Sequence, residues 1–380
     1  MRTFVDVPES TMKDYAHLIG EGIKHFTGSK ELGILETKRM AVMLENAEET
    51  LALQHGMDRH AFREAQTSTG SMSTFVKTQL PIIRRVYPNM ISRELVSVQP
   101  MTQPTTKLFY YDIKRDDATS LADGIHDKRT YANNVEYNPD SATAIKEINL
   151  TLTDSDVSAT EKKLKAKWTV EAQQDIMNYH GINVENDLTG ALATEITREW
   201  DRQNLQSLLD GATGGAATFN LTVPDSLTYQ DRKYWMETLY EKFIDVDTQI
   251  FKKRYRKTNW ILVPADIAGF IEKMAGFRSD GANPEQQVIQ TGGRYFMGSL
   301  NSRWRCYCDP FFPSNKILMG YNGTGDWLDT AAVFAPYILA YFSDTFTDPN
   351  TFQKVRAILS RAAFKVVVGD LLGVITTVGS

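Results

Sequence analysis

The stretch LPIIRRVYPNMI at residues 80–91, followed six residues later by VQPMTQPT at residues 98–105, decides how the fold of this 380-residue chain is interpreted. The first stretch closes a predicted short helix over 75–87 and ends in a Pro-Asn pair that is typical of a turn. Pro100 and Pro104 then break the next segment, which favours an extended conformation. Together the two stretches predict a short helix, a turn and then an extended segment.

Before residue 75 the sequence predicts an N-terminal helical arm, residues 1–74. Apolar side chains recur three and four residues apart from Ser10 to about His60. The polar segment 66–73 is typical of a flexible connection. Because about 60 residues is near the lower limit for a stable core, we expect the arm to need a partner surface.

Residues 112–167 are predicted to form a projecting β-element. Apolar and polar residues alternate over 148–153, and a turn is expected at 154–156. A second alternating run, 163–168, sets three lysines against Leu, Ala and Trp. Such an element has little core of its own and must also find a partner surface.

A long helix is predicted over 184–209, with Asn183 as its cap after a pause at Gly181. Its apolar residues form a stripe at four-residue spacing, and its roughly 26 residues would reach about 39 Å. The remaining chain alternates helical and strand signals, which indicates an α+β protein. Helices are expected at 234–256 and 264–274, and strands at 259–263, 303–308, 316–320 and 364–368.

The composition excludes several classes of protein. With 42% hydrophobic and 23% charged residues, the chain resembles a soluble globular protein. Its 42 Lys and Arg against 47 Asp and Glu give a formal charge of −5, so it has no global attraction for phosphate backbones or anionic lipid. No run approaches the roughly 20 apolar residues that cross a bilayer, and the first ten residues do not resemble a secretory signal. We expect synthesis in a cytoplasm and no membrane contact.

No pattern for catalysis, cofactor binding or metal binding was found. The chain lacks a phosphate loop, a zincin motif, a nucleophile elbow and a dinucleotide fingerprint. The glycine-rich loop 211–215 follows a helix rather than a strand, which is the wrong order for a phosphate site. The six histidines have no metal-ligand spacing, and Cys306 and Cys308 are expected to be buried free thiols. The sequence therefore predicts a protein that is not an enzyme and has no cofactor.

The cluster KKRYRK at residues 252–257 allows two interpretations. Basic residues around an aromatic can form a nucleic-acid patch. Positive charge at the end of a helix is also favoured by the helix dipole and usually makes a solvated face, and we prefer this second interpretation.

Several segments, in their order, resemble the major capsid proteins of T-even-type, contractile-tailed bacteriophages, which have the Hong Kong 97-type capsid fold. The two opening stretches are the most specific, and the resemblance covers most of the chain from about residue 75. It continues at 164–171, 180–182, 194–196, 259–263, 309–312, 335–337 and 348–353.

The resemblance implies a division of the chain into named parts. These are an N-terminal arm (1–74), a peripheral domain (75–111 and 168–224) with a spine helix at 184–209, an extended loop (112–167), an axial domain (225–345) and a return to the peripheral domain (346–380). It also implies a subunit that assembles as hexamers and pentamers into an icosahedral head around double-stranded DNA. Portal and scaffold proteins, and a decoration or cement protein, are the partners that it implies.

Two features depart from the family. An extra domain is inserted in the extended loop of T-even members, whereas only about 33 residues separate Tyr111 from Ile145 here. The family also removes an N-terminal propeptide, usually after a hydrophobic-x-Glu site. Only 34–36 fits that pattern well and it falls early, so we expect residues 1–60 to stay attached as a clasp between neighbours.

Candidate contact residues lie in the extended loop, where charges of both signs are dense and apolar residues few. They are Lys114, Arg115, Asp116, Asp117, Asp127, Lys128 and Arg129. Such charges are suited to setting the register of an interface with a complementary neighbour. Two rival functions remain open: an encapsulin-like compartment with the same fold, and an unrelated cytoplasmic enzyme.

Overall fold

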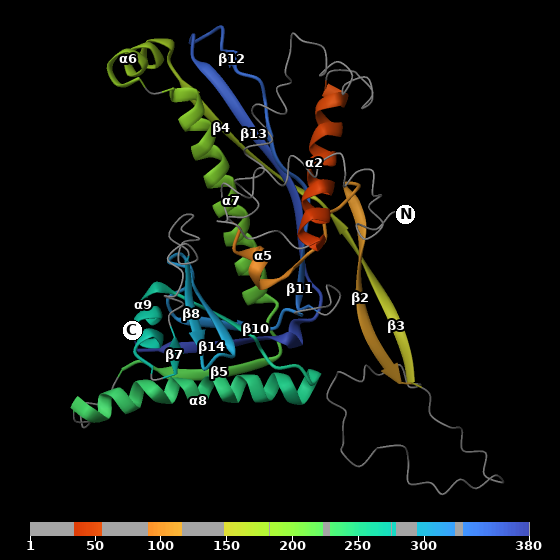
Figure 1. The fold of residues 1–380 in the computed structure, drawn as a ribbon, viewed down its shortest axis with the longest axis vertical. Helices are drawn as coiled ribbons and strands as arrows, with labels where there is room; N and C mark the ends of the chain where they lie inside the picture. The colour runs from red at the N-terminus through yellow and green to blue at the C-terminus, as the bar shows by residue number, and fades with distance from the viewer. Residues whose placement is uncertain are drawn as a thin grey trace, which may run out of the picture.

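The computed structural model describes residues 34–54, 90–115, 148–181, 183–222, 229–274, 276–278, 295–323 and 330–379. These residues form two β-sheets, a separate two-stranded hairpin and the helices that cover them. The molecule is elongated, with α6 and β12 at one end of its long axis and α8 toward the other (Figure 1). The expected α+β class is confirmed.

The longest helix, α7 (Val184–Asp210), is the predicted spine. Its 27 residues begin after Asn183, whose side chain accepts a hydrogen bond from the amide of Glu185. The preceding helix, α6 (Val170–His180), is capped by the Thr169 hydroxyl and ends at Gly181 in the left-handed conformation, with φ of 66°. Glycine adopts this conformation without steric cost, so the pause at Gly181 turns the chain between two helices.

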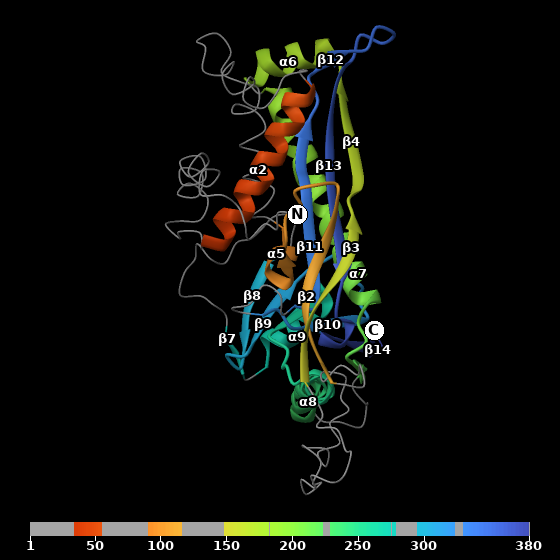
Figure 2. The same ribbon diagram turned by 90° about the vertical axis from the view of Figure 1, so that its right-hand side faces the viewer.

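One sheet lies along α7 and contains strands from distant parts of the chain. Its order is β1 (Ser97–Val98), β11 (Ala332–Phe342), β13 (Lys354–Val366) and β12 (Phe346–Thr347), and β4 (Thr160–Trp168) also pairs with β13. The central strand β13 is antiparallel to both β11 and β4. Figure 2 shows β4 and β13 running side by side up to α6.

Side chains of α7 are joined to one face of this sheet. The Trp200 indole N–H donates to the Ser360 hydroxyl at 2.8 Å, and both residues are buried. Arg356 forms an ion pair with Glu185 at 3.2 Å. The helix and sheet are therefore held together by buried polar contacts as well as by apolar packing.

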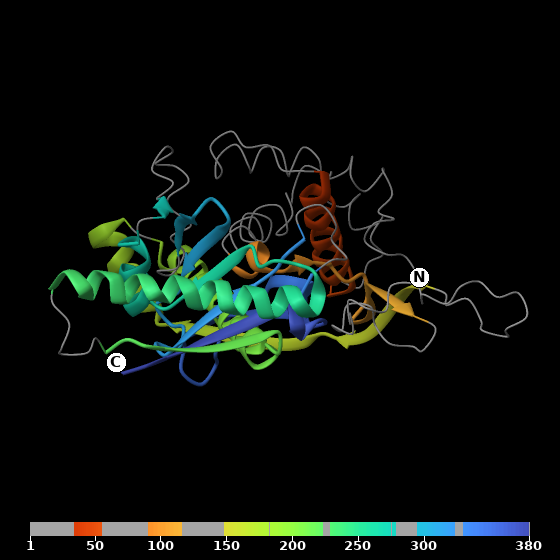
Figure 3. The ribbon, with the colours of Figure 1, turned by 90° about the horizontal axis from the view of Figure 1, so that it is seen from below.

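The second sheet is the predicted mixed region and has seven strands. Their order is β5 (Gly215–Asn220), β14 (Leu372–Val378), β10 (Lys316–Gly320), β6 (Trp260–Val263), β9 (Trp304–Cys308), β8 (Tyr295–Leu300) and β7 (Phe277–Arg278). The long helix α8 (Tyr229–Arg254) lies along β5 (Figure 3), and α9 (Ala265–Glu272) follows β6. The four predicted segments at 234–274 and 316–320 are confirmed to within a few residues.

Strand pairing joins segments that the expected domains keep apart. β11 lies in the sheet along α7, whereas the resemblance implies an axial domain over 225–345. β14 pairs with β5 and β10 in the other sheet, whereas the resemblance implies a return to the peripheral domain at 346–380. Both strands are apolar runs whose partners are far away in the sequence, so periodicity alone cannot assign them to a sheet. The domain boundaries remain predictions.

The projecting β-element also differs from the prediction. Strand β3 (Ile148–Ser158) continues through the expected turn at 154–156, because β2 (Thr105–Arg115) offers it an unbroken antiparallel partner. The chain breaks at Ala159 instead, and the second alternating run becomes β4 of the sheet along α7. The described part of the element is therefore a β2–β3 hairpin rather than two strands joined at 154–156.

Part of the N-terminal arm packs within its own subunit, contrary to expectation. Helix α2 (Ile34–Gln54) buries one apolar face in the main core next to β11. The buried Asn46 side chain donates to the carbonyl of Met101 at 2.7 Å and to that of Tyr337 at 3.0 Å. These bonds join the helix to the chain before β2 and to β11 at once. Residues 1–33 and 55–74 of the arm lie outside the described residues.

The buried carboxylate of Asp201 links α7 to the short helix α5 (Ser92–Leu95). It accepts the amide N–H groups of Ile91 and Ser92, both at 3.3 Å, and the Ser92 hydroxyl at 2.7 Å. Asn204, one turn later, donates to the same hydroxyl at 3.0 Å. This network holds the end of the 80–91 motif against the spine.

Replacing Asp201 by Ala should lower the free energy of unfolding by about 3 kcal/mol, because it leaves two amides and a hydroxyl without an acceptor. Urea titration followed by circular dichroism would measure the change. The matched control is Asp175→Ala on the exposed surface of α6, which should change stability by less than about 0.5 kcal/mol. Equal stability of the two variants would contradict the role given to this network.

Replacing Asn46 by Ala should loosen α2 from the subunit, since the carbonyls of Met101 and Tyr337 would lose a buried donor. Hydrogen exchange followed by mass spectrometry should show faster exchange in 38–53 than in α7. Leu53→Ala, at a side chain that is 73% exposed, is the control and should leave exchange unchanged. Unaltered exchange in Asn46→Ala would mean that apolar packing alone holds the helix.

Candidate assembly interface

The β2–β3 hairpin carries the first two of the candidate contact residues. Its register runs from the Thr105–Ser158 pair to the Arg115–Ile148 pair, with Lys114 opposite Asn149. Lys114 and Arg115 therefore lie at the far end of the hairpin. The other five candidates, Asp116, Asp117, Asp127, Lys128 and Arg129, fall outside the described residues, so the structure does not bring the set together or separate it.

Among the described residues, the hairpin lacks the support that such an element needs. β2 and β3 form a two-stranded sheet of their own, and only the base of β3 approaches β13. The base is covered by a small apolar cluster that includes Met101, Val157 and Val333. A two-stranded hairpin is marginally stable alone in water and usually needs a third strand or a packed face. The outer part of the hairpin is thus a surface that a second molecule could complete.

The face of the long sheet that points away from α7 is strongly basic. Cross-strand pairing of Glu161 with Arg361, Lys163 with Leu359, Lys165 with Ala357 and Lys167 with Val355 puts these side chains on one face. Lys163, Lys165 and Lys167 are all exposed. Alternation in the sequence predicts a face of lysines, but it places them on the projecting β-element, because their pairing partner β13 is far away in the sequence.

Lys162 belongs to the opposite face of β4 and is held there. Its ammonium group donates to the Glu199 carbonyl at 3.1 Å, forms an ion pair with the Glu199 carboxylate at 3.3 Å and lies over the Trp200 ring. Burial lowers the pKa of Lys162, and the nearby Glu199 carboxylate opposes that shift. Lys162 therefore fastens β4 to α7 and is not part of the exposed row.

The basic cluster at the end of α8 is partly structural. Arg254 forms an ion pair with Asp370 at 3.0 Å, and Lys253 donates to the Thr213 carbonyl at 2.7 Å. Although burial acts in the opposite direction, hydrogen bonds from Thr213 and Arg254 hold the pKa of Asp370 below its ordinary value. These contacts join α8 to the segment before β14, which favours the structural interpretation of 252–257 over a nucleic-acid patch.

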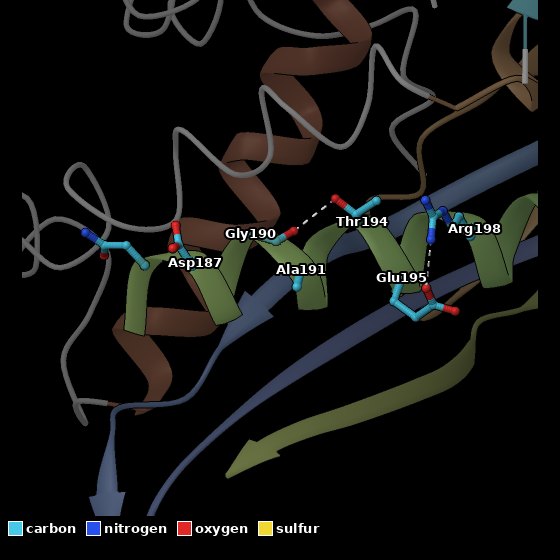
Figure 4. Close-up of a pocket in the computed structure, with 7 residues that line it drawn as sticks. Asp187, Gly190, Ala191, Thr194, Glu195 and Arg198 are labelled. Carbon is cyan, nitrogen blue, oxygen red and sulfur yellow. Dashed lines mark hydrogen bonds and ion pairs between the residues drawn. The ribbon is translucent and has the colours of Figure 1, made fainter. Parts of the chain in front are cut away.

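A shallow pocket runs along one side of α7 (Figure 4). Small residues, Gly190 and Ala191, form its floor, and the ion pair of Arg198 with Glu195 at 3.3 Å lies at one end. The Thr194 hydroxyl donates a hydrogen bond to the Gly190 carbonyl at 3.0 Å. The lining offers no nucleophile paired with a base, which is the arrangement that covalent catalysis requires.

The described residues hold no group of three or more His, Cys, Asp or Glu side chains placed to bind a metal ion. No described helix is long and apolar enough to span a bilayer. Cys306 and Cys308 are buried reduced thiols, as expected. Burial raises the pKa of Cys306 to about 12, so this thiol stays protonated and unreactive near neutral pH.

Comparison with known proteins identifies relatives among phage head proteins. The family described as "Major capsid protein Gp23" matches residues 72–134 and 111–372, which is most of the chain. The major capsid protein of Serratia phage KSP90 is 28% identical over 203 residues, covering 50% of this chain and 44% of that protein. The major capsid protein of Enterobacteria phage T4 is 24% identical over 224 residues, covering 54% and 42%. The matched region thus spans less than half of these relatives.

Among solved structures, the capsid of Myoviridae phage XM1 aligns with 77% of this chain and 91% of its own, with a TM-score of 0.48 and 9% identity. The spine helix and the extended hairpin are both present in the described residues. Because the family match extends over well more than half of this chain, the chain belongs to the major capsid protein Gp23 family.

Proposed function

We propose that this chain is the shell-forming subunit of the head of a contractile-tailed bacteriophage. Subunits would join as hexamers and pentamers and close into an icosahedral shell around double-stranded DNA. The observation that carries the proposal is the family match across residues 72–372. The chain would act through its surfaces and not through catalysis.

The geometry of the subunit supports this function. The outer part of the β2–β3 hairpin has no third strand or helix beside it among the described residues. A ring of identical subunits supplies such a surface to every member, because a head-to-tail contact that closes leaves no hairpin uncovered. The hairpin contact would therefore be used once per subunit throughout the shell.

The charge of the chain suits a wall around nucleic acid. A formal charge of −5 permits proximity to packaged DNA without strong binding, because the chain has no excess of positive charge to attract phosphate. The contacts of Lys253 and Arg254 within the subunit reduce the basic surface that 252–257 would offer to phosphate. Portal, scaffold and decoration or cement proteins would be further partners, and the virion head would be the final location after synthesis in the host cytoplasm.

An encapsulin-like compartment is the second candidate, since it would use the same fold to enclose an enzyme. The curated relatives are head proteins of phages, which favours the capsid over this alternative. Nucleic acid within purified particles would support a capsid, whereas an enclosed enzyme without DNA would support the compartment.

The full chain, expressed in bacteria and purified, should sediment as rings and closed shells rather than as monomers. Analytical ultracentrifugation and negative-stain electron microscopy would measure this distribution over increasing protein concentration. The association has a physical cause, because the exposed hairpin gains a packed face only from a neighbour. A single monomeric species at high concentration, with an ordered hairpin, would contradict the proposed function.

Replacing Lys128 and Arg129 together by Glu should leave the fold unchanged and make shells fewer or more sensitive to salt. Each exposed ion pair contributes about 0 to 1 kcal/mol, but a shell repeats the contact in every subunit. Circular dichroism checks the helical content, and sedimentation at several salt concentrations measures assembly. The control Lys128→Arg, with Arg129→Lys, keeps both charges and should assemble normally.

Unchanged assembly and salt dependence in the Glu variant would show that these two charges do not set the register of an interface. Unfolding of that variant as a monomer would mean that the segment belongs to a core, and the extended-loop assignment would then be wrong.

A further inference from the structure

The basic face of the long sheet has an excess of positive charge that its own subunit does not neutralise among the described residues. The face presents four basic side chains and one acidic side chain, which gives a net charge of +3. The members are Lys163, Lys165, Lys167, Arg361 and Glu161. Glu161 is already shared by Lys163 at 2.8 Å and Arg361 at 3.3 Å. Lys165 and Lys167 make no hydrogen bond or ion pair with a described residue.

The three lysines of β4 form a regular row. Alternate residues of a strand lie about 6.6 Å apart, so Lys163, Lys165 and Lys167 present three charges over about 13 Å. Between them and β11, the face offers Ala357 and Leu359, which are only partly buried. A partner with closely spaced carboxylates could meet this row in register.

The connection at the end of the β2–β3 hairpin has the opposite charge. Residues 116–147 contain seven acidic and three basic residues, which gives a net charge of −4. The acidic residues are Asp116, Asp117, Asp123, Asp127, Glu136, Asp140 and Glu147, and the basic ones are Lys128, Arg129 and Lys146. The acidic excess of this connection is thus opposite in sign to the basic excess of the sheet face.

The subunit's own row is poorly placed to receive its own hairpin. The 11 residues of β2 extend the hairpin by about 36 Å. Its far end lies toward α8, whereas β4 carries the lysine row toward α6 at the other end of the long axis (Figures 1 and 2). The connection would have to fold back along the subunit to reach its own lysine row, whereas the row of a neighbouring copy can lie directly beside the hairpin end.

We propose that the lysine row of β4, Lys163, Lys165 and Lys167, is the docking surface for the acidic hairpin connection, residues 116–147, of a second copy of this chain. This inference rests on the proposed function and names the partner surface that the extended hairpin would use. The contact is head-to-tail, because each copy contributes a hairpin to one neighbour and a row to another. Such a contact closes into a ring when the rotation between successive copies divides a full turn evenly.

The lysines also have an ordinary structural explanation. β4 pairs with β13 on one side only, and lysines on an edge strand discourage unwanted pairing with other sheets. In that case any charged side chain at positions 165 and 167 would protect the edge strand equally well. The two explanations differ in whether the sign of the charge matters and whether it can be restored from another segment.

The test uses the full chain and three variants. In the row variant Lys165 and Lys167 become Glu; in the connection variant Asp116 and Asp117 become Lys; the third carries all four changes. We expect the row and connection variants each to reduce the assembled fraction at 0.15 M salt by about tenfold, and the four-fold variant to recover most of it. Sedimentation and electron microscopy measure assembly, and circular dichroism checks folding.

Mixing the row variant with the connection variant distinguishes neighbours from contacts within one chain. In the mixture, the unaltered acidic connection can meet an unaltered lysine row, and the connection with Lys at 116 and 117 can meet the row with Glu at 165 and 167. Both pairings occur only between different chains. Rescue on mixing supports docking between copies. Recovery in the four-fold variant without rescue on mixing would overturn the proposal in favour of docking within a subunit.

Two controls separate charge from side-chain loss and from net charge. Lys165→Arg with Lys167→Arg keeps the charges and should assemble like the unaltered chain. Lys252→Glu with Lys257→Glu makes the same change in net charge on exposed residues near the end of α8 and should assemble normally. Normal assembly of the row variant would overturn the inference and leave the proposed function standing, whereas failure of the unaltered chain to assemble would count against the proposed function itself.

Discussion

The arrangement of the subunit depends on the pairing of β13 with β11 on one side and with β4 on the other, while α7 packs across the same sheet. The buried bond from Trp200 to Ser360 and the ion pair of Arg356 with Glu185 fix the helix on the central strand. β4 occupies one edge of β13 and follows β3 after Ala159 alone, so the β2–β3 hairpin leaves the long sheet at this point. The long sheet, the spine helix and the exposed hairpin are thus consequences of one set of pairings.

This arrangement divides the surface of the subunit by function. On the face of the sheet toward α7, charged side chains find partners within the subunit, as the contacts of Lys162 with Glu199 illustrate. On the opposite face, Lys165 and Lys167 have no acidic partner among the described residues. Polar groups that are paired within the subunit stabilise its fold, whereas charges without a partner there favour association with a second subunit and set the register of the contact. A shell-forming protein needs both kinds of surface.

Helix α2 changes the expected role of the N-terminal arm. Its buried face and the two bonds of Asn46 make 38–53 a part of the subunit core, so only the rest of the arm is left as a candidate clasp between neighbours. The same helix meets β11 close to the chain that leads into β2. The arm, the hairpin and the long sheet are therefore in direct contact, and a change in the position of one would alter the packing of the others.

The sequence by itself determined the features that depend on neighbouring residues. Asn183 and Gly181 set the start of the spine helix through capping and a left-handed turn. An apolar run marked β6 as a buried strand, and alternation marked β10 as a strand. The ordered motifs beginning at residue 80 identified the family. Tertiary structure alone decided that β3 runs through 154–156, that β14 joins the sheet of β5 and that α2 packs against β11. Each of these depends on a partner far away in the chain, because a strand or an apolar helix face is stabilised by whichever complementary surface folding brings to it, and periodicity does not record which surface that is.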